Sequence, residues 1–364
     1  MNKYTGPIVD IDIHHRPKNS SELAAYLPKL WQDNIRGNLS SIPDLAPPAA
    51  PFITVSDGRR ADTVTEPGVA SGYDFELLKE SLLDHHDYYK AVLTHDVGEW
   101  PAHANHYFVR DLCRAANDWT IDHWLSKDDR LNMVLIVPTG EPDEAAAEIR
   151  RIGHHPRCVG VLFAANQLGR PVGDPIYHPI YEAAVETGLQ IAIHVGIDRP
   201  NRLTTSVGGP PGTHAEAGSQ CTQQAMHYVS SLIVHGVFEK YPDLHVMIKE
   251  YGVAWLPPFL WRLDQEYELL RLESPWVKKW PSEYVRAHIK LSTQPIEDSP
   301  RRGGTVEFLE LFDGIEELLC FSTDYPHQSM DYPEYIARLL PAAWHRKVFC
   351  DNACSVYGWE LPPY

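Results

Sequence analysis

The chain has 364 residues, of which 43% are hydrophobic, and a formal net charge of −17 from 32 basic and 49 acidic residues. This length and apolar content suffice for one large domain, and the acidic balance without a basic tract argues against nucleic acid as a partner. No apolar run approaches a membrane span, and no basic segment followed by an apolar one opens the chain, so we expect a cytoplasmic protein that does not enter a membrane.

Residues 7–17 alternate apolar and polar side chains as a strand does. We expect one face with Val9, Ile11 and Ile13 and the other with Asp10, Asp12 and His14. Asp12 and His14 would then project together, about 6–7 Å apart along the strand. Burying both is unfavourable unless something pairs with them, and a divalent metal is one such partner. An exposed or hydrogen-bonded pair on an edge strand is the alternative.

The segment after this strand is unusually long. Ser20 is expected to cap a helix over about 21–31, and residues 40–72 then show little periodicity. A segment of this length in a compact domain is typically a functional lid or a disordered insertion. Its position directly after the strand with Asp12 and His14 favours a lid.

From residue 87 onward, apolar strands alternate with helices. Further strands are predicted at 90–94, 131–138, 158–163, 189–195, 244–249, 288–291 and 318–322. Helices are predicted at about 104–126, 143–152, 179–187, 219–239, 255–268, 303–311, 332–340 and 342–357. Eight such units, with no glycine-rich phosphate loop, indicate a closed (β/α)₈ TIM barrel with a long inserted loop after strand 1. We expect residues 1–364 to form this single domain.

Functional groups of such a barrel lie where its strands end. Four of the predicted strands end in side chains that bind metals: Asp12 and His14 on the first, His194 on the fifth, Glu250 on the sixth and Asp324 on the eighth. Each alone has an ordinary structural explanation, but the set predicts a mononuclear metal site. The mixture of oxygen and nitrogen donors suits zinc or manganese.

The chain also resembles the amidohydrolase superfamily, in the branch that holds the aminocarboxymuconate-semialdehyde and γ-resorcylate decarboxylases. The residues that carry this resemblance, along essentially the whole chain, are 8–14, 174–175, 179–184, 193–196, 236–244, 255–257, 261–264, 322–327, 352–353 and 356–358. The resemblance implies that Asp12, His14, His194 and Asp324 hold one divalent metal ion, zinc or manganese, at the mouth of the barrel. Relatives also suggest a homodimer or homotetramer.

The chain departs from the family pattern at two strand ends. Asp12 stands where many members have a histidine, and Glu250 stands where a histidine that acts in the decarboxylases is usual. A divalent metal with two aspartates, two neutral histidines and an ionised Glu250 has a charge of about −1, whereas a decarboxylase needs cations to attract a carboxylate. This favours hydrolysis of a small organic substrate, cyclic or aromatic, by a metal-activated water, with Asp324 or Glu250 as the base.

Two alternatives remain open. The first is non-oxidative decarboxylation of an aromatic or unsaturated acid, in which Arg262, or Arg199 and Arg202, binds the carboxylate and Asp324 protonates the carbon. Arg262 is equally compatible with a surface ion pair on its helix. The second alternative is a metal-free barrel that serves as a binding protein. For either enzyme, His214 and His327 are expected to contact the substrate.

Overall fold

The computed structural model describes residues 4–37, 59–66, 69, 71–96, 105–163, 168–195 and 213–363. Eight parallel strands form one sheet in sequence order. The strands are β1 (Ile8–His15), β2 (Tyr88–His95), β3 (Leu131–Ile136), β4 (Cys158–Phe163), β5 (Gln190–His194), β6 (Val246–Lys249), β7 (Ile289–Ser292) and β8 (Leu319–Cys320). The chain just after β8 continues along β1, where Asp324 N donates to Asp12 O at 3.0 Å and His14 N to Tyr325 O at 2.7 Å. These bonds close the sheet, and the predicted (β/α)₈ barrel is confirmed.

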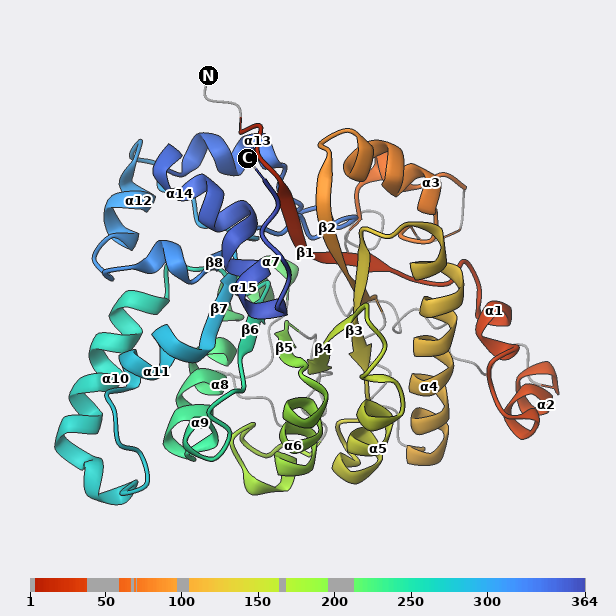
Figure 1. Ribbon diagram of the computed structural model, residues 1–364, viewed down its shortest axis with the longest axis horizontal. Helices are drawn as coiled ribbons and strands as arrows, with labels where there is room; N and C mark the ends of the chain where they lie inside the picture. The colour runs from red at the N-terminus through yellow and green to blue at the C-terminus, as the bar shows by residue number, and fades with distance from the viewer. Residues whose placement is uncertain are drawn as a thin grey trace.

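Helices surround the sheet and cover its outer face (Figure 1). The α-helices of the described residues are α1 (Ser20–Ala24), α2 (Lys29–Gly37), α3 (Phe75–Leu78), α4 (His106–His123), α5 (Pro142–Ile152), α6 (His178–Thr187), α7 (His214–Gln220), α8 (Thr222–Val234), α9 (Val237–Lys240), α10 (Leu256–Leu270), α11 (Pro281–His288), α12 (Gly304–Leu309), α13 (Pro333–Leu339), α14 (Ala342–Arg346) and α15 (Asn352–Tyr357). Of these, α1 and α2 extend away from the barrel (Figure 1). None of the helices in the described ranges is long and apolar enough to cross a bilayer.

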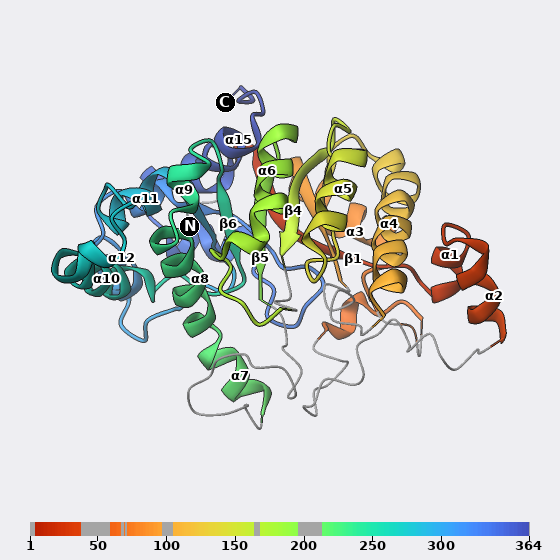
Figure 2. The same ribbon diagram turned by 90° about the horizontal axis from the view of Figure 1, so that it is seen from below.

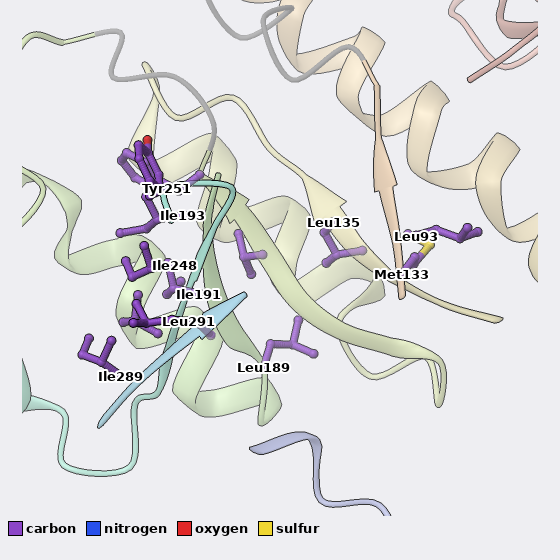
Figure 3. Packing of buried hydrophobic residues seen from close by; sticks show 14 of the residues in the cluster. Leu93, Met133, Leu135, Leu189, Ile191, Ile193, Ile248, Tyr251, Ile289 and Leu291 are labelled. Carbon is purple, nitrogen blue, oxygen red and sulfur yellow. The ribbon is translucent and has the colours of Figure 1, made fainter. Parts of the chain in front are cut away.

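The main core lies between the strands and these helices. Apolar side chains stand in rows on successive strands, as Ile193 of β5, Ile248 of β6 and Leu291 of β7 illustrate (Figure 3). Strands of a parallel barrel are buried on both faces, which explains why their sequences are nearly continuous apolar runs.

A second cluster fills the barrel and closes its amino end. Val9 and Ile11 of β1 meet Met247 of β6, although β1 and β6 are not neighbours in the sheet, so these side chains point inward. Cys354 of α15 packs in the same cluster. Figure 2 shows α15 at the end of the barrel opposite to that toward which the arrow of β4 points. The opposite, carboxyl end of the strands is therefore the end available for function.

The strict alternation predicted for the first strand is wrong. The register of β1 against β2 shifts between Asp10 and Ile13, so Ile13 joins the outer core while Val9 and Ile11 line the interior. Asp10 accepts hydrogen bonds from Tyr88 and Thr323 and lies apart from the metal-competent groups found among the described residues. A bulge of this kind interrupts the alternation, so side chains before and after it no longer follow one pattern of inner and outer faces.

Two helix predictions also need correction, and one further helix was missed. The helix expected over about 21–31 is split into α1 and α2, because Pro28 lacks the N–H that a continuous helix requires, and Asn19, not Ser20, caps α1. The helix expected over 219–239 is α7, α8 and α9, with Gly236 at φ 74° before α9. Helix α11 was not predicted, although Pro281 at its first position and Glu283 bonded to Trp280 N are typical of a helix start.

Candidate metal centre

The carboxyl end of β1 brings Asp12 and His14 to one site. Their side chains are buried, with 1% and 4% exposed, and Asp12 Oδ2 lies 3.9 Å from His14 Nε2. The predicted shared face of Asp12 and His14 is therefore retained, although Asp12 lies within the stretch where the register of β1 shifts.

The ends of β5 and β8 add His194 and Asp324. His194 Nε2 lies 3.1 Å from Asp12 Oδ2, and His14 Nε2 lies 3.2 Å from Asp324 Oδ1. His194 Nδ1 lies 2.7 Å from the carbonyl oxygen of Val195. Because a carbonyl only accepts, Nδ1 must hold the proton, and Nε2 is left with the lone pair that a metal requires.

The residues present fit a divalent metal ion. Both ring nitrogens of His14 and Nε2 of His194 are buried without a hydrogen-bond partner among the described residues. Donor atoms lie within 4.8 Å of one another in two groups that share His14: Asp12, His14 and His194, and His14, Glu250, Asp324 and His327. Buried polar atoms without partners are rare in folded proteins, and here a cation would satisfy them.

Two of the strand-end residues have strained backbones. Glu250 has φ 64° and Asp324 has φ 61°, a region that residues with a side chain rarely adopt. Such a conformation costs about 1–3 kcal/mol and persists where the surroundings hold it. Glu250 N donates to Ser292 Oγ at 2.9 Å, and Asp324 N donates to the backbone of β1, so both turns are held by neighbouring strands.

The buried groups shift one another's pKa values in opposite directions. Burial together with the charge of His327 lowers the pKa of His14 to about 4. Burial also opposes protonation of His194, but the carboxylates of Asp12 and Glu250 outweigh it and raise the His194 pKa to about 9. Two adjacent imidazoles thus differ strongly in basicity.

The pKa values of two carboxyl groups, Glu250 and Asp324, are also shifted in opposite directions. Burial and the charge of Asp324 raise the pKa of Glu250 to about 8. Burial would raise the pKa of Asp324 as well, but His327 and His14 outweigh it and hold that pKa at about 2. Paired groups with diverging pKa values are typical of acid–base sites.

Lys249, which the sequence analysis did not select, lies inside the cluster. This last residue of β6 is fully buried, and its Nζ donates to Asp12 Oδ1 at 3.3 Å and to Thr94 Oγ1 at 3.1 Å. Thr94 Oγ1 also donates to Asp12 Oδ1. Both oxygens of Asp12 are therefore engaged, Oδ1 by Lys249 and Thr94 and Oδ2 by the histidines.

A second group of charged residues that the sequence did not predict surrounds Asp96, just after β2. Its carboxylate pairs with Arg59, lies 3.5 Å from Arg16 NH1, and lies 3.4 Å from His327 Nε2. His327 in turn bonds Asp324 through Nδ1 and so links the two carboxylates. These partners are all at least four-fifths buried.

The charge of about −1 derived from the sequence is therefore wrong. Lys249 raises the charge of the metal-loaded centre by one, and Asp96 with its two arginines raises it by one more. Counted over these groups, the result is about +1 with Glu250 ionised and one unit higher when Glu250 carries its proton. The count from the sequence included the metal-binding side chains but none of the cations beside them.

The residues predicted to contact the substrate differ in their distance from the metal centre. His327 belongs to the centre. Arg262 does not: its side chain is 73% exposed on α10 and pairs with Glu266 one turn away, at 2.6 Å. His214 begins α7, and its side chain lies outside the described residues. Arg199, Arg202 and most of the predicted lid at 40–72 also lie outside them.

A closed barrel with this donor set at its carboxyl end defines a metal-dependent barrel enzyme. The chain belongs to the amidohydrolase family, whose pattern matches residues 11–359. The predicted superfamily is confirmed, and with it a metal-dependent enzyme of the hydrolase or carboxy-lyase kind. The predicted divalent metal cofactor is likewise supported by the donor groups at the strand ends.

Similar proteins cover most of the chain. γ-Resorcylate decarboxylase of Rhodococcus jostii (strain RHA1) is 23% identical over 299 residues, which make up 78% of this chain and 88% of that protein. The structure of 2,6-dihydroxybenzoate decarboxylase with 2,6-dihydroxybenzoate has a TM-score of 0.67 at 18% identity and covers 97% of this chain and 99% of that one. A manganese-bound 5-carboxyvanillate decarboxylase from Novosphingobium aromaticivorans has a TM-score of 0.70 at 19% identity and covers 98% of this chain and 100% of that one. At these identities the structures establish the shared fold.

Proposed function

We propose that this protein is a metal-dependent decarboxylase that removes carbon dioxide, without an oxidant, from a small aromatic carboxylic acid. The observation that carries the proposal is the charge of the centre, which Lys249, Arg59 and Arg16 make positive once a divalent metal is bound. A positive centre attracts and retains an anionic carboxylate. The relatives support the same reaction, since all three are named as decarboxylases of aromatic acids.

In this proposal Asp12, His14, His194 and Asp324 hold the metal. Manganese is favoured over zinc because a structural neighbour contains manganese. When bound, the ion would supply a fixed positive charge for the oxygen atoms of the substrate. Asp12 and Asp324 suit the role of ligands because they are almost fully buried, with 1% and 0% of their side chains exposed, and remain ionised.

Decarboxylation replaces a carbon–carboxylate bond by a carbon–hydrogen bond, so it consumes one proton for each carbon dioxide released. Glu250 is the proposed proton donor. Its side chain is 20% exposed, so it can contact both a substrate and solvent, whereas Asp324 is enclosed. The raised pKa of Glu250, about 8, supports this assignment. Glu250 therefore replaces Asp324 as the acid of the decarboxylase alternative.

His327 and His214 keep proposed roles as substrate contacts. His327 has 20% of its side chain exposed at the edge of the buried donors. Helix α7, which His214 begins, lies on the side of the barrel toward which the arrow of β4 points (Figure 2). We therefore keep both residues as proposed contacts on the substrate side.

The test is release of carbon dioxide by the manganese-loaded protein from a panel of hydroxybenzoates that includes 2,6-dihydroxybenzoate. We expect stoichiometric carbon dioxide and, in deuterated water, one deuterium on the carbon that loses the carboxylate. A fully metal-loaded protein that releases none from the whole panel would contradict the proposal.

Hydrolysis, the first choice from the sequence, is the second candidate. It is favoured by Glu250, a carboxylate close to the metal donors that could take a proton from water. Incorporation of ¹⁸O from labelled water into the product of an ester, amide or lactone would identify this reaction instead.

A further inference from the structure

Lys249 is an unusual residue for the interior of a barrel. A lysine is almost never fully buried unless it is paired, because removing an ammonium group from water is unfavourable. Lys249 has no exposed surface, and Asp12, a proposed metal ligand, is its carboxylate partner. The pairing therefore links a buried ammonium group directly to the proposed metal centre.

The contacts of Asp12 place this charge on the side of the carboxylate away from the histidines. Oδ1 receives hydrogen bonds from Lys249 and Thr94, whereas Oδ2 lies 3.1 Å from His194 Nε2. Lys249 therefore does not occupy the oxygen that faces the ring nitrogens. It adds charge to the centre from the other side of the Asp12 carboxylate.

That added charge raises the total charge of the centre by one unit. With a divalent metal bound and Asp12 and Asp324 ionised, the inner cluster without Lys249 would have a charge of −1 when Glu250 is ionised and zero when Glu250 carries its proton. The group around Asp96 adds one positive charge. With Lys249 the total is positive in both protonation states of Glu250, whereas without Lys249 it is neutral when Glu250 is ionised; at this buried location solvent screens charge weakly.

We propose that Lys249 is a specificity-determining residue, which keeps the metal-loaded centre positive so that it binds mono-anionic ligands such as carboxylates in preference to neutral ones. This inference rests on the proposed function and deepens it, because it names the residue that selects the charge of the substrate. Lys249 acts through the potential at the centre and not as a donor to the reacting atoms.

The test compares an anion with a neutral molecule as ligands of the cobalt-loaded protein, followed by its visible absorption. Azide is the anionic probe and imidazole the neutral one. In K249Q and K249M, azide should bind at least tenfold more weakly while imidazole binding changes less than twofold. Cobalt content should stay at the wild-type level, since loss of a nearby positive charge does not disfavour a cation.

K290Q is the matched control. Lys290 lies on the adjacent strand β7, where its Nζ donates to the carbonyl of Glu317 at 2.6 Å, away from the donor groups. This variant removes the same formal charge, and its binding of both probes should equal that of the wild type.

Three results would overturn the proposal. Unchanged azide affinity in K249Q would mean that the lysine does not set the charge of the centre. Equal weakening of azide and imidazole, or loss of cobalt, would mean that Lys249 organises the site and does not select charge. None of these measurements needs turnover, so failure to release carbon dioxide would refute the decarboxylase proposal while leaving this one open to its own test.

Discussion

Replacement of Asp10 by asparagine is expected to stabilise the protein above pH 7. Asp10 is fully buried beside Asp12, and burial raises its pKa to about 7 in spite of hydrogen bonds from Thr323. Oδ1 accepts from the backbone N–H groups of Asp12 and Thr323, both at 3.1 Å. Oδ2 contacts two hydroxyls, those of Thr323 at 2.6 Å and Tyr88 at 3.4 Å. An asparagine keeps the acceptor at Oδ1 and can donate to either hydroxyl at the other position.

The sign and size of the effect follow from the pKa. The pKa of Asp10 in the folded protein lies above the ordinary value of 3.8. The contribution of protonated Asp10 to the free energy of unfolding is therefore fully present below about pH 4 and is lost as the pH rises through 7. A shift of about three units corresponds to about 4 kcal/mol of unfolding free energy. For a chain of 364 residues this is roughly a 5 °C change in melting temperature.

Thermal melting of wild type and D10N at pH 5 and pH 8, with saturating manganese, measures this difference. D10N should melt several degrees higher than wild type at pH 8, and the advantage should shrink at pH 5. D129N is the matched control, because Asp129 is fully exposed and its replacement should have little effect at either pH. A D10N protein that melts lower than wild type at both pH values would show that Asp10 is ionised and that its hydrogen bonds dominate.

Two further replacements test the proposed roles at the centre. Asp324→Asn should lower the metal content below one ion per chain and abolish carbon dioxide release, because the replaced carboxylate lies 3.2 Å from His14 Nε2. Full activity in a folded D324N protein would show that Asp324 is not a metal ligand. Glu250→Gln should keep the metal but slow deuterium incorporation by about 10²- to 10⁴-fold, the usual contribution of a general acid, and an unchanged rate would exclude Glu250 as the proton donor.

The fold and the metal donors were predictable because both depend on regular features of the chain. The strands of a parallel barrel are apolar runs, and their carboxyl ends meet at one edge, so Asp12, His14, His194, Glu250 and Asp324 could be brought together from sequence position alone. The structure places these five side chains in the two donor groups that share His14. Their roles as ligands, acid or base remain predictions.

The missed residues differ in how much signal they offered. Asp96 lies two residues beyond the strand predicted at 90–94 and could have been found by the same rule. Lys249 ends the apolar strand predicted at 244–249, and because it lies two residues after the inward-facing Met247, its side chain shares the inner face of that strand. Arg59 lies in a segment without periodicity, so only tertiary structure could place it beside Asp96. Arg262 shows the opposite error, since a sequence motif does not reveal which face of a helix meets solvent.

The choice between reactions depended on these missed cations. The carboxylates were selected because they are metal ligands at strand ends. The cations beside them are Lys249, the last residue of an apolar strand, Arg16 just after β1, and Arg59 from a distant segment. A count restricted to metal-binding side chains therefore makes such a centre too negative and favours hydrolysis. With Lys249 and the arginine partners of Asp96 included, the same physical criterion favours an anionic substrate.

The backbone supports a functional reading of the same residues. Only three non-glycine residues in the described ranges have positive φ, and two of them are Glu250 and Asp324. Either position could adopt this conformation with less strain as glycine. Both positions instead have a residue with a carboxyl group in this strained conformation. A hydrogen bond to Ser292 holds the backbone of Glu250, and a hydrogen bond to β1 holds that of Asp324. Because these turns aim two carboxyls with opposite pKa shifts at one cluster, the strain is better explained by chemistry at the centre than by folding.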